Sequence, residues 1–311
     1  MKVLFLSETF PDANHPTIGT YNLALCRELS REHEVRVIAP RSWIDVLRGS
    51  RYSPSEAAHK AGIEVCYPTR WYTPRFAQGL YGGQMWWSIR GAVKTLTRGW
   101  TPDAILSYWA HPDGECGLRA SRQFGVPCAV IVGGTDVLIL PHRPERGPSV
   151  RRVLMESDAV ITVSDGLNDA CLQLGADPNR VVTIRQGIDP SVFYPGDRQS
   201  SRSKLGIEDS SDPLLVWVGR MVDLKRVDLL IQAARQLREQ GRRVRICLLG
   251  SGPSRDRWQK LAETEGVADQ IRFVGSVPHD HLADWYRAAD LTVLCSESEG
   301  LPNVLRESVA C

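Results

Sequence analysis

Short apolar runs alternate with amphipathic stretches along this chain from its first residues onward. Helical spacing lies between several of the runs, as where Tyr21, Leu25 and Leu29 recur every four residues. Such alternation predicts βαβ units, and therefore an α/β fold with mostly parallel sheets covered on both faces. The strands predicted in the first part are Val3–Ser7, Val35–Ala39, Ile63–Tyr67, Ala104–Tyr108, Cys128–Val132, Ala159–Val163 and Val181–Ile184.

The pattern stops once and then restarts, which predicts two domains. Residues 195–213 are polar, rich in serine and nearly free of large apolar side chains. We therefore expect an N-terminal domain over 1–190, a linker over 191–213 and a C-terminal domain over 214–311, with ligand bound in a cleft between the domains. The strands predicted after the restart are Leu214–Val218, Val244–Leu249, Ile271–Val274 and Leu291–Leu294.

Composition and charge exclude several classes of protein. The 311 residues are 42% hydrophobic and 24% charged, with a formal net charge of +2. Disorder is therefore excluded, and no nucleic-acid partner is expected. No run approaches the ~20 apolar residues of a membrane span, and Glu8 ends the first run too early for a secretory signal.

The cysteines indicate a reducing compartment. The chain has 8 of them, with no Cys-x-x-Cys pair and no His/Cys spacing typical of a zinc site. Most lie inside apolar runs, which is typical of reduced, buried cysteines. We therefore expect a cytoplasmic protein without disulfides.

Candidate chemistry follows the strand Leu214–Val218. Gly219 permits a sharp turn there, and Arg220 and Lys225, five residues apart, would project from the loop. Two cations at this spacing suit a diphosphate. Taken alone, the same residues also fit a surface arginine and a solvated lysine at the start of a helix.

The last segment carries a second candidate group. Pro302 fits the first position of a helix. The N–H groups near it would then be free to bind an anion. Seven residues separate Glu299 from Glu307. Carboxylates beside an anion site are unfavourable unless cations or hydroxyls meet them, and sugar and ribose hydroxyls do so. The alternative is two ordinary exposed glutamates.

Gly-Arg-x4-Lys followed by Glu-Gly-Leu-Pro-Asn-x3-Glu resembles the retaining glycosyltransferases of the GT-B fold that carry a Glu-x7-Glu signature, glycosyltransferase family 4. The resemblance implies two Rossmann-like domains that face each other across a cleft. It also implies that the chain stops inside the helix of Glu307, so that the second domain is incomplete and the chain marginally stable or inactive. Further similar segments are FPDANHPTIGTYNLALCREL, 108–114, 133–136, 161–164 and 186–189.

The resemblance also implies roles for single residues. Arg220 and Lys225 would neutralise the leaving diphosphate, Glu307 would bind ribose hydroxyls, and Glu299 would face the transferred sugar. His111 would lie near that sugar and complete the catalytic set with Glu299, Arg220 and Lys225. Asp136 would line the acceptor side or brace its loop. The implied donor-binding residues are Gly19, Gly219, Arg220, Lys225, Glu299, Gly300, Leu301, Pro302, Asn303, Val304 and Glu307.

The metal requirement is predicted from an absent motif. Many glycosyltransferases hold a divalent metal on Asp-x-Asp, and this chain contains no such motif. Cations and a helix N-terminus can stabilise a leaving diphosphate instead. We therefore expect no metal and no cofactor, with the nucleotide-sugar acting as donor substrate.

Residues 65–102 predict an acceptor face. They contain no Asp or Glu, and in the helix expected there Trp87 groups with Arg90 and Lys94. A basic face with an interfacial Trp suits an anionic bilayer surface or a lipid-phosphate acceptor. An ordinary covering helix remains the alternative.

The sequence thus predicts a nucleotide-sugar-dependent glycosyltransferase that acts on a glycan or lipid-linked acceptor in the synthesis of cell-surface polysaccharide or glycolipid. A sugar-nucleotide epimerase of the same architecture is the alternative enzyme, and the Glu-x7-Glu pattern favours the transferase. An inactive nucleotide-sugar-binding fragment is the non-enzymatic alternative.

Overall fold

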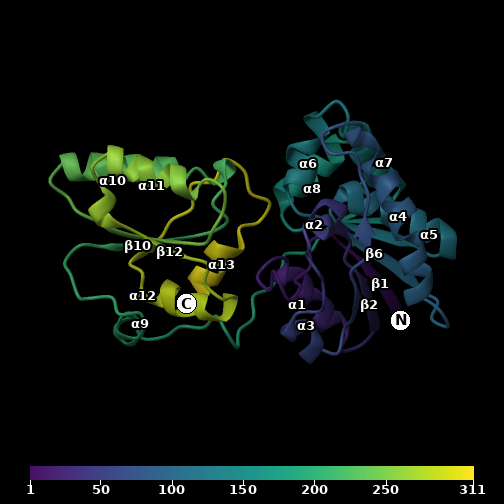
Figure 1. Ribbon diagram of the computed structural model, residues 1–311, viewed down its shortest axis with the longest axis horizontal. Helices are drawn as coiled ribbons and strands as arrows, with labels where there is room; N and C mark the ends of the chain where they lie inside the picture. Colours follow the sequence, from purple (N-terminus) through teal and green to yellow (C-terminus); the bar gives the residue numbers. More distant parts are fainter. The chain divides into compact units, whose positions relative to one another are not determined.

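The computed structural model describes residues 1–311, which form two compact units. The first unit is Met1–Arg185 and the second is Gln186–Cys311. Figure 1 shows them in purple to teal and in green to yellow. Each is an α/β unit with its own parallel sheet, so the predicted fold class is confirmed.

The first unit contains a seven-stranded sheet in the order β4-β2-β1-β6-β7-β8-β9. Every pair in it is parallel. Each predicted strand of this unit is present, with ends that differ by no more than two residues. The strands are β1 Lys2–Leu6, β2 Glu34–Ile38, β4 Glu64–Cys66, β6 Ala104–Tyr108, β7 Cys128–Val132, β8 Ala159–Thr162 and β9 Val181–Thr183.

Helices connect these strands and bury their apolar sides on the sheet. In α4, Met85, Ile89 and Val93 are fully buried at helical spacing, which fixes the face that α4 turns to the core. The helices are α1 Thr20–Leu29, α2 Trp43–Leu47, α3 Glu56–Lys60, α4 Tyr81–Leu96, α5 Glu115–Phe124, α6 Thr135–Leu138, α7 Gly147–Glu156 and α8 Asp165–Gln173.

A second, two-stranded sheet pairs β3, Arg41–Ser42, with β5, Thr69–Arg70. The sequence pattern does not predict it, because two residues are too few to show an alternation. This small sheet brings the segment after β2 beside the segment after β4.

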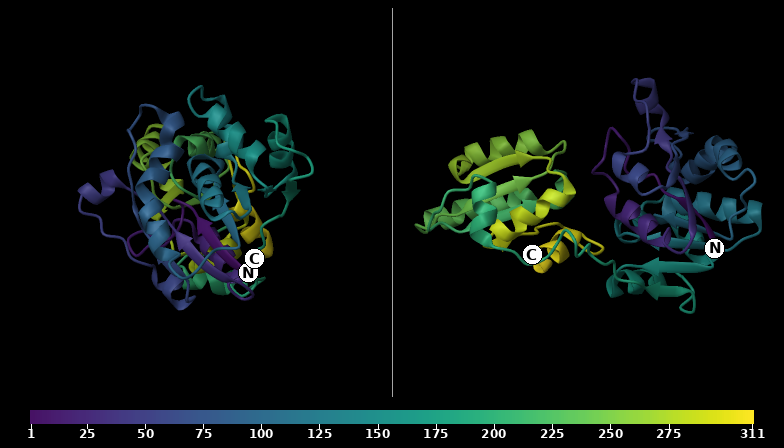
Figure 2. Two further views of the ribbon diagram at one scale, coloured as in Figure 1. Left: turned by 90° about the vertical axis from the view of Figure 1, so that its right-hand side faces the viewer. Right: turned by 90° about the horizontal axis from the view of Figure 1, so that it is seen from below.

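The second unit has a four-stranded parallel sheet in the order β12-β11-β10-β13. Helices α10 and α11 cover one face, and α12 and α13 cover the other (Figures 1 and 2). Its elements are α9 Arg198–Lys204, β10 Leu214–Val218, α10 Val227–Glu239, β11 Arg245–Leu249, α11 Arg255–Thr264, β12 Ile271–Gly275, α12 Leu282–Ala288, β13 Leu291–Thr292 and α13 Asn303–Ala310.

The expected linker is part of the second unit. The boundary between units falls after Arg185, five residues before the predicted one. Helix α9 packs on α12, and Arg202, largely buried, donates from Nε to Ala288 O at 3.0 Å. Serine and charged residues in this stretch therefore mark a helix with a mostly exposed surface. No helix of the structure has the length and apolar character that a bilayer crossing requires.

Both sheets have a point at which the strand order reverses. In the first unit it lies between β1 and β6, and in the second between β10 and β13. Open parallel sheets bind ligands outside the carboxyl ends of the strands at this switch point. The segments that follow these four strands are therefore expected to carry a ligand-binding site.

Candidate functional site

In the second unit, the loop after β10 bonds directly to the loop after β13. The Glu297 N–H donates to Leu224 O at 2.9 Å, and Cys295 Sγ donates to Lys225 O at 3.2 Å. The two strands are neighbours in the sheet, with Val216 opposite Thr292. The Gly-Arg-x4-Lys motif and the Glu-x7-Glu motif therefore meet at one switch point.

Lys225 and Glu299 form an ion pair at this place. Their side chains are 23% and 24% exposed, so both remain accessible to a ligand. Arg220 is exposed, and its side chain makes no ion pair. The structure thus joins two predicted donor residues and leaves a third free for an anion.

Helix α13 begins one residue later than predicted. Pro302 occupies the cap position with an extended backbone (φ −74°, ψ 106°), and Asn303 is the first helical residue. No side chain caps this end. The N–H groups of the first turn have no acceptor within the helix, so they can donate to an anion.

Glu307 differs from its predicted environment. It is buried, and both of its carboxylate oxygens already receive a hydrogen bond. Tyr286 donates from its hydroxyl at 2.9 Å, and His279 Nε2 lies 2.8 Å from the other oxygen. The interpretation of Glu307 as an ordinary exposed glutamate is therefore wrong, and a ribose would have to share the carboxylate with these partners.

The loops after β10 and β11 touch at the level of the backbone. Gly250 has φ 128°, and a side chain there would overlap the carbonyl oxygen of Gly219. The Gly219 N–H in turn donates to Leu249 O at 3.0 Å. Gly250 is therefore required by a close approach of two main chains beside Arg220, whereas a Cβ at Gly219 would lie 3.1 Å from the Trp217 ring.

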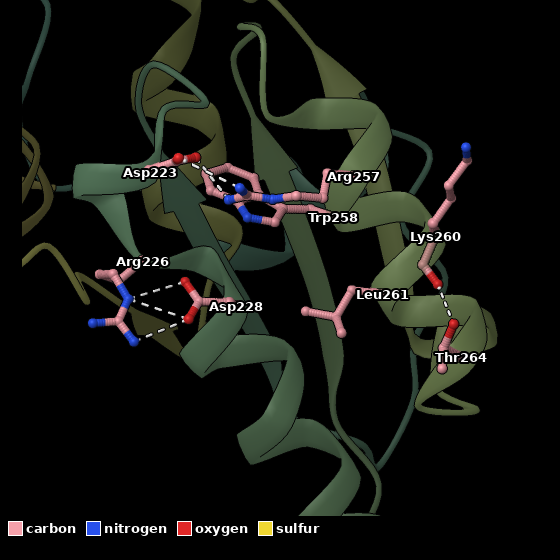
Figure 3. Close-up of a pocket in the computed structure, with 8 residues that line it drawn as sticks. All are labelled: Asp223, Arg226, Asp228, Arg257, Trp258, Lys260, Leu261 and Thr264. Atoms are coloured by element: carbon pink, nitrogen blue, oxygen red, sulfur yellow. Dashed lines mark hydrogen bonds and ion pairs between the residues drawn. The ribbon is translucent and has the colours of Figure 1, made fainter.

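Figure 3 shows a cavity of about 520 Å³ in the same unit. Its charged groups largely pair with one another, Arg257 with Asp223 at 2.7 Å and Arg226 with Asp228 at 3.0 Å. None of the predicted donor residues lines it, so it is not the predicted donor site. It is lined by Asp223, Arg226, Asp228, Arg257, Trp258, Lys260, Leu261 and Thr264.

In the first unit, His111 is buried in the turn after β6. Its Nδ1 lies 3.2 Å from Arg146 Nε and 3.1 Å from Arg146 Nη2. A guanidinium can only donate, so Nδ1 accepts and the ring proton sits on Nε2. Burial and then the nearby Arg146, Arg70 and Arg152 lower the pKa of His111 from 6.5 to about 3. His111 is therefore a neutral imidazole near pH 7.

Asp136 braces its loop and does not line an acceptor surface. It is fully buried, and its carboxylate accepts from the N–H groups of Ala110 at 2.9 Å, Gly133 at 3.1 Å and Gly134 at 2.9 Å. These bonds tie the turn after β6 to the turn after β7. They also hold Trp109, whose φ of 85° is unusual for a residue with a side chain.

Gly19 stands before α1 with a φ of 74°. A Cβ at this position would lie 2.5 Å from Thr9 O. Only glycine fits both this conformation and this contact. The close approach is therefore to the protein's own chain, which brings the first loop against the residues after β1.

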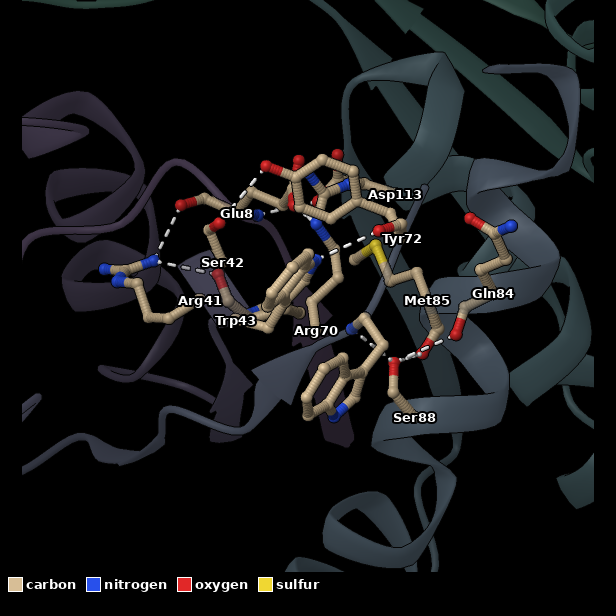
Figure 4. A network of polar contacts seen from close by, with 12 residues as sticks. Glu8, Arg41, Ser42, Trp43, Arg70, Tyr72, Gln84, Met85, Ser88 and Asp113 are labelled. Atoms are coloured by element: carbon tan, nitrogen blue, oxygen red, sulfur yellow. Dashed lines mark hydrogen bonds and ion pairs between the residues drawn. The ribbon is translucent and has the colours of Figure 1, made fainter. Parts of the chain in front are cut away.

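A network of charged side chains surrounds Glu8, which lies two residues beyond the end of β1 (Figure 4). It includes Asp113, Arg41 and Arg70. Sequence reasoning assigned no role to Glu8, included Arg70 only in the basic stretch 65–102 and Asp113 only in the similar segment 108–114, and missed Arg146. The available signal was that Glu8 and Asp113 follow strands on either side of a switch point. No group of three or more His, Cys, Asp or Glu side chains is placed to hold a metal.

The predicted basic face of α4 is exposed. Trp87 is 65% exposed, and Arg90 and Lys94 are exposed beside it at helical spacing. Phe76 and Leu80, in the segment before α4, are 74% and 62% exposed. These exposures fit both predicted interpretations of α4, a surface turned to an anionic bilayer and an ordinary covering helix.

Two glycosyltransferase families match the chain. The family described as "Glycosyl transferase 4-like domain" matches residues 17–187, and "Glycosyl transferases group 1" matches residues 197–311. D-inositol 3-phosphate glycosyltransferase 2 of Catenulispora acidiphila is 34% identical over 226 residues, which cover 66% of this chain and 51% of that relative. The chain thus spans about half the length of the curated relatives that it matches.

Solved structures share the fold over the whole chain. Sucrose-phosphate synthase from Thermosynechococcus elongatus has a TM-score of 0.79 at 19% identity, covering 100% of this chain and 79% of that one. HepE from Anabaena in complex with UDP-glucose has a TM-score of 0.74 at 17% identity, covering 100% and 78%. Both units therefore have the Rossmann-like architecture of the GT-B fold.

Proposed function

This chain belongs to the glycosyl transferase 4-like family, and we propose that it transfers a sugar from a nucleotide-sugar donor to an acceptor hydroxyl. The observation that carries the proposal is the ion pair of Lys225 with Glu299. It supports the proposal because an ammonium, which suits a diphosphate, and a carboxylate, which suits sugar hydroxyls, lie side by side at the switch point of the second unit.

The leaving group of such a transfer is a nucleoside diphosphate, which gains negative charge as the sugar departs. Lys225 and Arg220 supply positive charge, and the uncapped N-terminus of α13 supplies N–H donors and a favourable dipole. The resemblance to HepE, whose structure holds UDP-glucose, supports a donor of this class. We propose that these groups act without a divalent metal.

Glu299 has a binding role in this proposal. Its carboxylate, held by Lys225, accepts hydrogen bonds from hydroxyls of the transferred sugar beside the charge that stabilises the leaving group. On this proposal the transfer proceeds with retention: the acceptor hydroxyl attacks the anomeric carbon on the same face of the sugar from which the nucleoside diphosphate departs. The anomeric configuration of the product, read by NMR, tests this part of the proposal.

The acceptor is a hydroxyl-bearing glycan, lipid-linked sugar or small polyol. A lipid-linked acceptor is favoured by the exposed Trp87, Arg90 and Lys94 of α4, which suit an anionic bilayer surface. A phosphorylated polyol is favoured by the relatives, which are named as D-inositol 3-phosphate glycosyltransferases. On this proposal the enzyme works in the assembly of cell-surface polysaccharide or glycolipid.

A donor screen tests the function. The chain is incubated with a panel of nucleotide-sugars, with and without a mixed pool of glycan, lipid-linked and polyol acceptors, and released nucleoside diphosphate is measured. Release that depends on both donor and acceptor is the expected result. Conversion of the donor to its epimer without an acceptor would contradict it, and donor binding without release would indicate a binding protein.

A further inference from the structure

Glu8 and Asp113 lie on either side of the switch point of the first unit. Glu8 follows β1 and Asp113 follows β6, the two strands between which the strand order reverses. The Glu8 N–H donates to Asp113 Oδ1 at 2.6 Å, which joins the two segments across this point. Side chains placed here face the region where parallel sheets bind their ligands.

Buried charges hold the main chain of Glu8 from both ends. Asp113, 1% exposed, takes its N–H, and Arg41, 8% exposed, donates from Nη1 to its carbonyl oxygen at 2.7 Å. Arg41 is fixed in turn by Asp12, which accepts from Nε at 3.1 Å and from Nη2 at 3.0 Å. Buried polar groups are costly unless they are hydrogen-bonded, so these contacts fix the backbone at Glu8 firmly.

The side chain of Glu8, unlike its backbone, is partly exposed and only partly paired. It stays 26% exposed, and its carboxylate pairs with Arg70 through Oε1. The ion pair of this carboxylate involves Oε1, and no hydrogen bond of the structure reaches Oε2. Because an ionised carboxylate can accept about four hydrogen bonds, most of the acceptor sites of the Glu8 carboxylate are unused.

Tyr72 provides a flat wall beside this carboxylate. The Arg70 guanidinium lies 4.4 Å from the centre of the Tyr72 ring, a cation–π contact. Ser42 Oγ lies 3.2 Å from the Tyr72 hydroxyl, and Trp43 Nε1 donates to the Tyr72 carbonyl at 2.9 Å. The hydroxyl and the main chain of Tyr72 are therefore both fixed, and Tyr81 packs against its ring in a T-shaped contact with the ring centroids 5.4 Å apart.

We propose that Glu8 is an acceptor-binding residue, whose carboxylate receives a hydrogen bond from a hydroxyl of the acceptor sugar or polyol at the switch point of the first unit. The inference rests on the proposed function and names the acceptor contact within it. A neutral hydroxyl suits the place because a carboxylate repels anions, and because Arg70 already meets the need for a cation.

The pKa shifts of Glu8 and Asp113 support a ligand that donates a hydrogen bond to Glu8. Burial raises the pKa of Glu8, and the Arg70, Arg146 and Arg41 charges oppose this rise. Burial and the neighbouring Glu8 also raise the pKa of Asp113 well above its usual range. A hydroxyl that donates to Glu8 stabilises its ionised form and so relieves part of the cost of burial.

The test uses neutral probes that carry no phosphate, namely myo-inositol and methyl α-D-glucopyranoside. Binding to the chain is measured by saturation-transfer NMR and titration. Glu8→Gln keeps the shape and removes the charge, and we expect it to weaken probe binding by about 10- to 100-fold, the value of a charge-assisted hydrogen bond. Glu28→Gln, an exposed acid on α1, is the matched control and leaves binding unchanged.

A double variant separates ligand binding from a purely structural ion pair. If Glu8 only neutralises Arg70, then adding Arg70→Met to Glu8→Gln restores both the melting temperature and probe binding. On our inference the melting temperature recovers and probe binding does not. Unchanged probe binding in Glu8→Gln, or failure of both probes to bind the unaltered chain, overturns the inference. Failure of the proposed function is read separately, as absence of donor-dependent nucleotide release.

Discussion

Arg146 donates to Nδ1 of His111 from two of its nitrogens, Nε at 3.2 Å and Nη2 at 3.1 Å. It also donates from Nη2 to the His111 carbonyl oxygen at 3.0 Å. His111 is therefore held as one tautomer, with its proton on Nε2. A role for His111 as a proton acceptor near pH 7 is excluded by this arrangement, and a role as a neutral N–H donor fits it.

The first prediction concerns this tautomer. In NMR spectra of the 15N-labelled chain, the His111 ring should show a protonated Nε2 and a bare Nδ1 from pH 8 to pH 5, without titration. The physical reason is that burial and Arg146 lower the pKa to about 3. Arg146→Met should raise the pKa towards 6.5, and Arg143→Met, an exposed neighbour, should not. A midpoint near pH 6.5 in the unaltered chain would contradict the assignment.

The second prediction is a dependence of stability on pH. The folded pKa of His111 is about 3 and the unfolded value is 6.5, so the unfolded state binds more protons between these limits. The contribution of His111 to the free energy of unfolding is therefore fully present above pH 6.5, and it is lost as the pH falls from 6.5 towards 3. The slope should approach ~1.4 kcal/mol per pH unit in this window.

Urea unfolding at several pH values measures this slope as the difference between the unaltered chain and His111→Gln. Taking the difference removes the shared contribution of Glu8 and Asp113, whose raised pKa values act in the opposite direction. Parallel curves for the two proteins between pH 6 and pH 4 would show that His111 titrates normally.

The third prediction concerns Asp136, whose carboxylate accepts from three backbone N–H groups. Asp136→Ala leaves these donors unsatisfied in a buried place and should lower the free energy of unfolding by roughly 2–4 kcal/mol. Asp165→Ala removes an exposed acid and is the control. Urea denaturation checks the values, and equal effects of the two substitutions would refute the bracing role.

The success of the strand predictions has a simple physical cause. Strands buried on both faces need continuous apolar runs, and such runs are visible in the sequence. The meeting of Lys225 with Glu299 was likewise predictable, because both follow strands of one parallel sheet and the carboxyl ends of such strands share an edge. A strand as short as β3 cannot be recognised in this way, because two residues are too few to form an apolar run or an alternating pattern.

The residues missed by sequence reasoning owe their roles to distant partners. Arg146 meets His111 across 35 positions, and Tyr286 meets Glu307 across 21. Tyr286 lies in the amphipathic pattern of α12, where an aromatic residue is expected to pack in the core. Only the folded chain shows that its hydroxyl reaches a carboxylate.

The fourth prediction concerns the exposed face of α4. Co-sedimentation with vesicles of anionic lipid should recover the chain, and Arg90→Glu with Lys94→Glu should abolish this binding, because the basic charges attract the surface and Trp87 inserts into it. Arg151→Glu with Arg242→Glu changes the net charge equally at exposed positions elsewhere and is the control. Equal recovery of both double variants would indicate an ordinary covering helix.

The most direct test of the account is acceptor-dependent nucleotide release by Lys225→Met, compared with the unaltered chain and with Lys260→Met. Loss of the Lys225 ammonium, which pairs with Glu299 and is proposed to meet the leaving diphosphate, should lower kcat by roughly 10²- to 10³-fold. Lys260→Met should retain full turnover, since Lys260 lies outside the donor site. Unchanged turnover in Lys225→Met would contradict the proposed donor site.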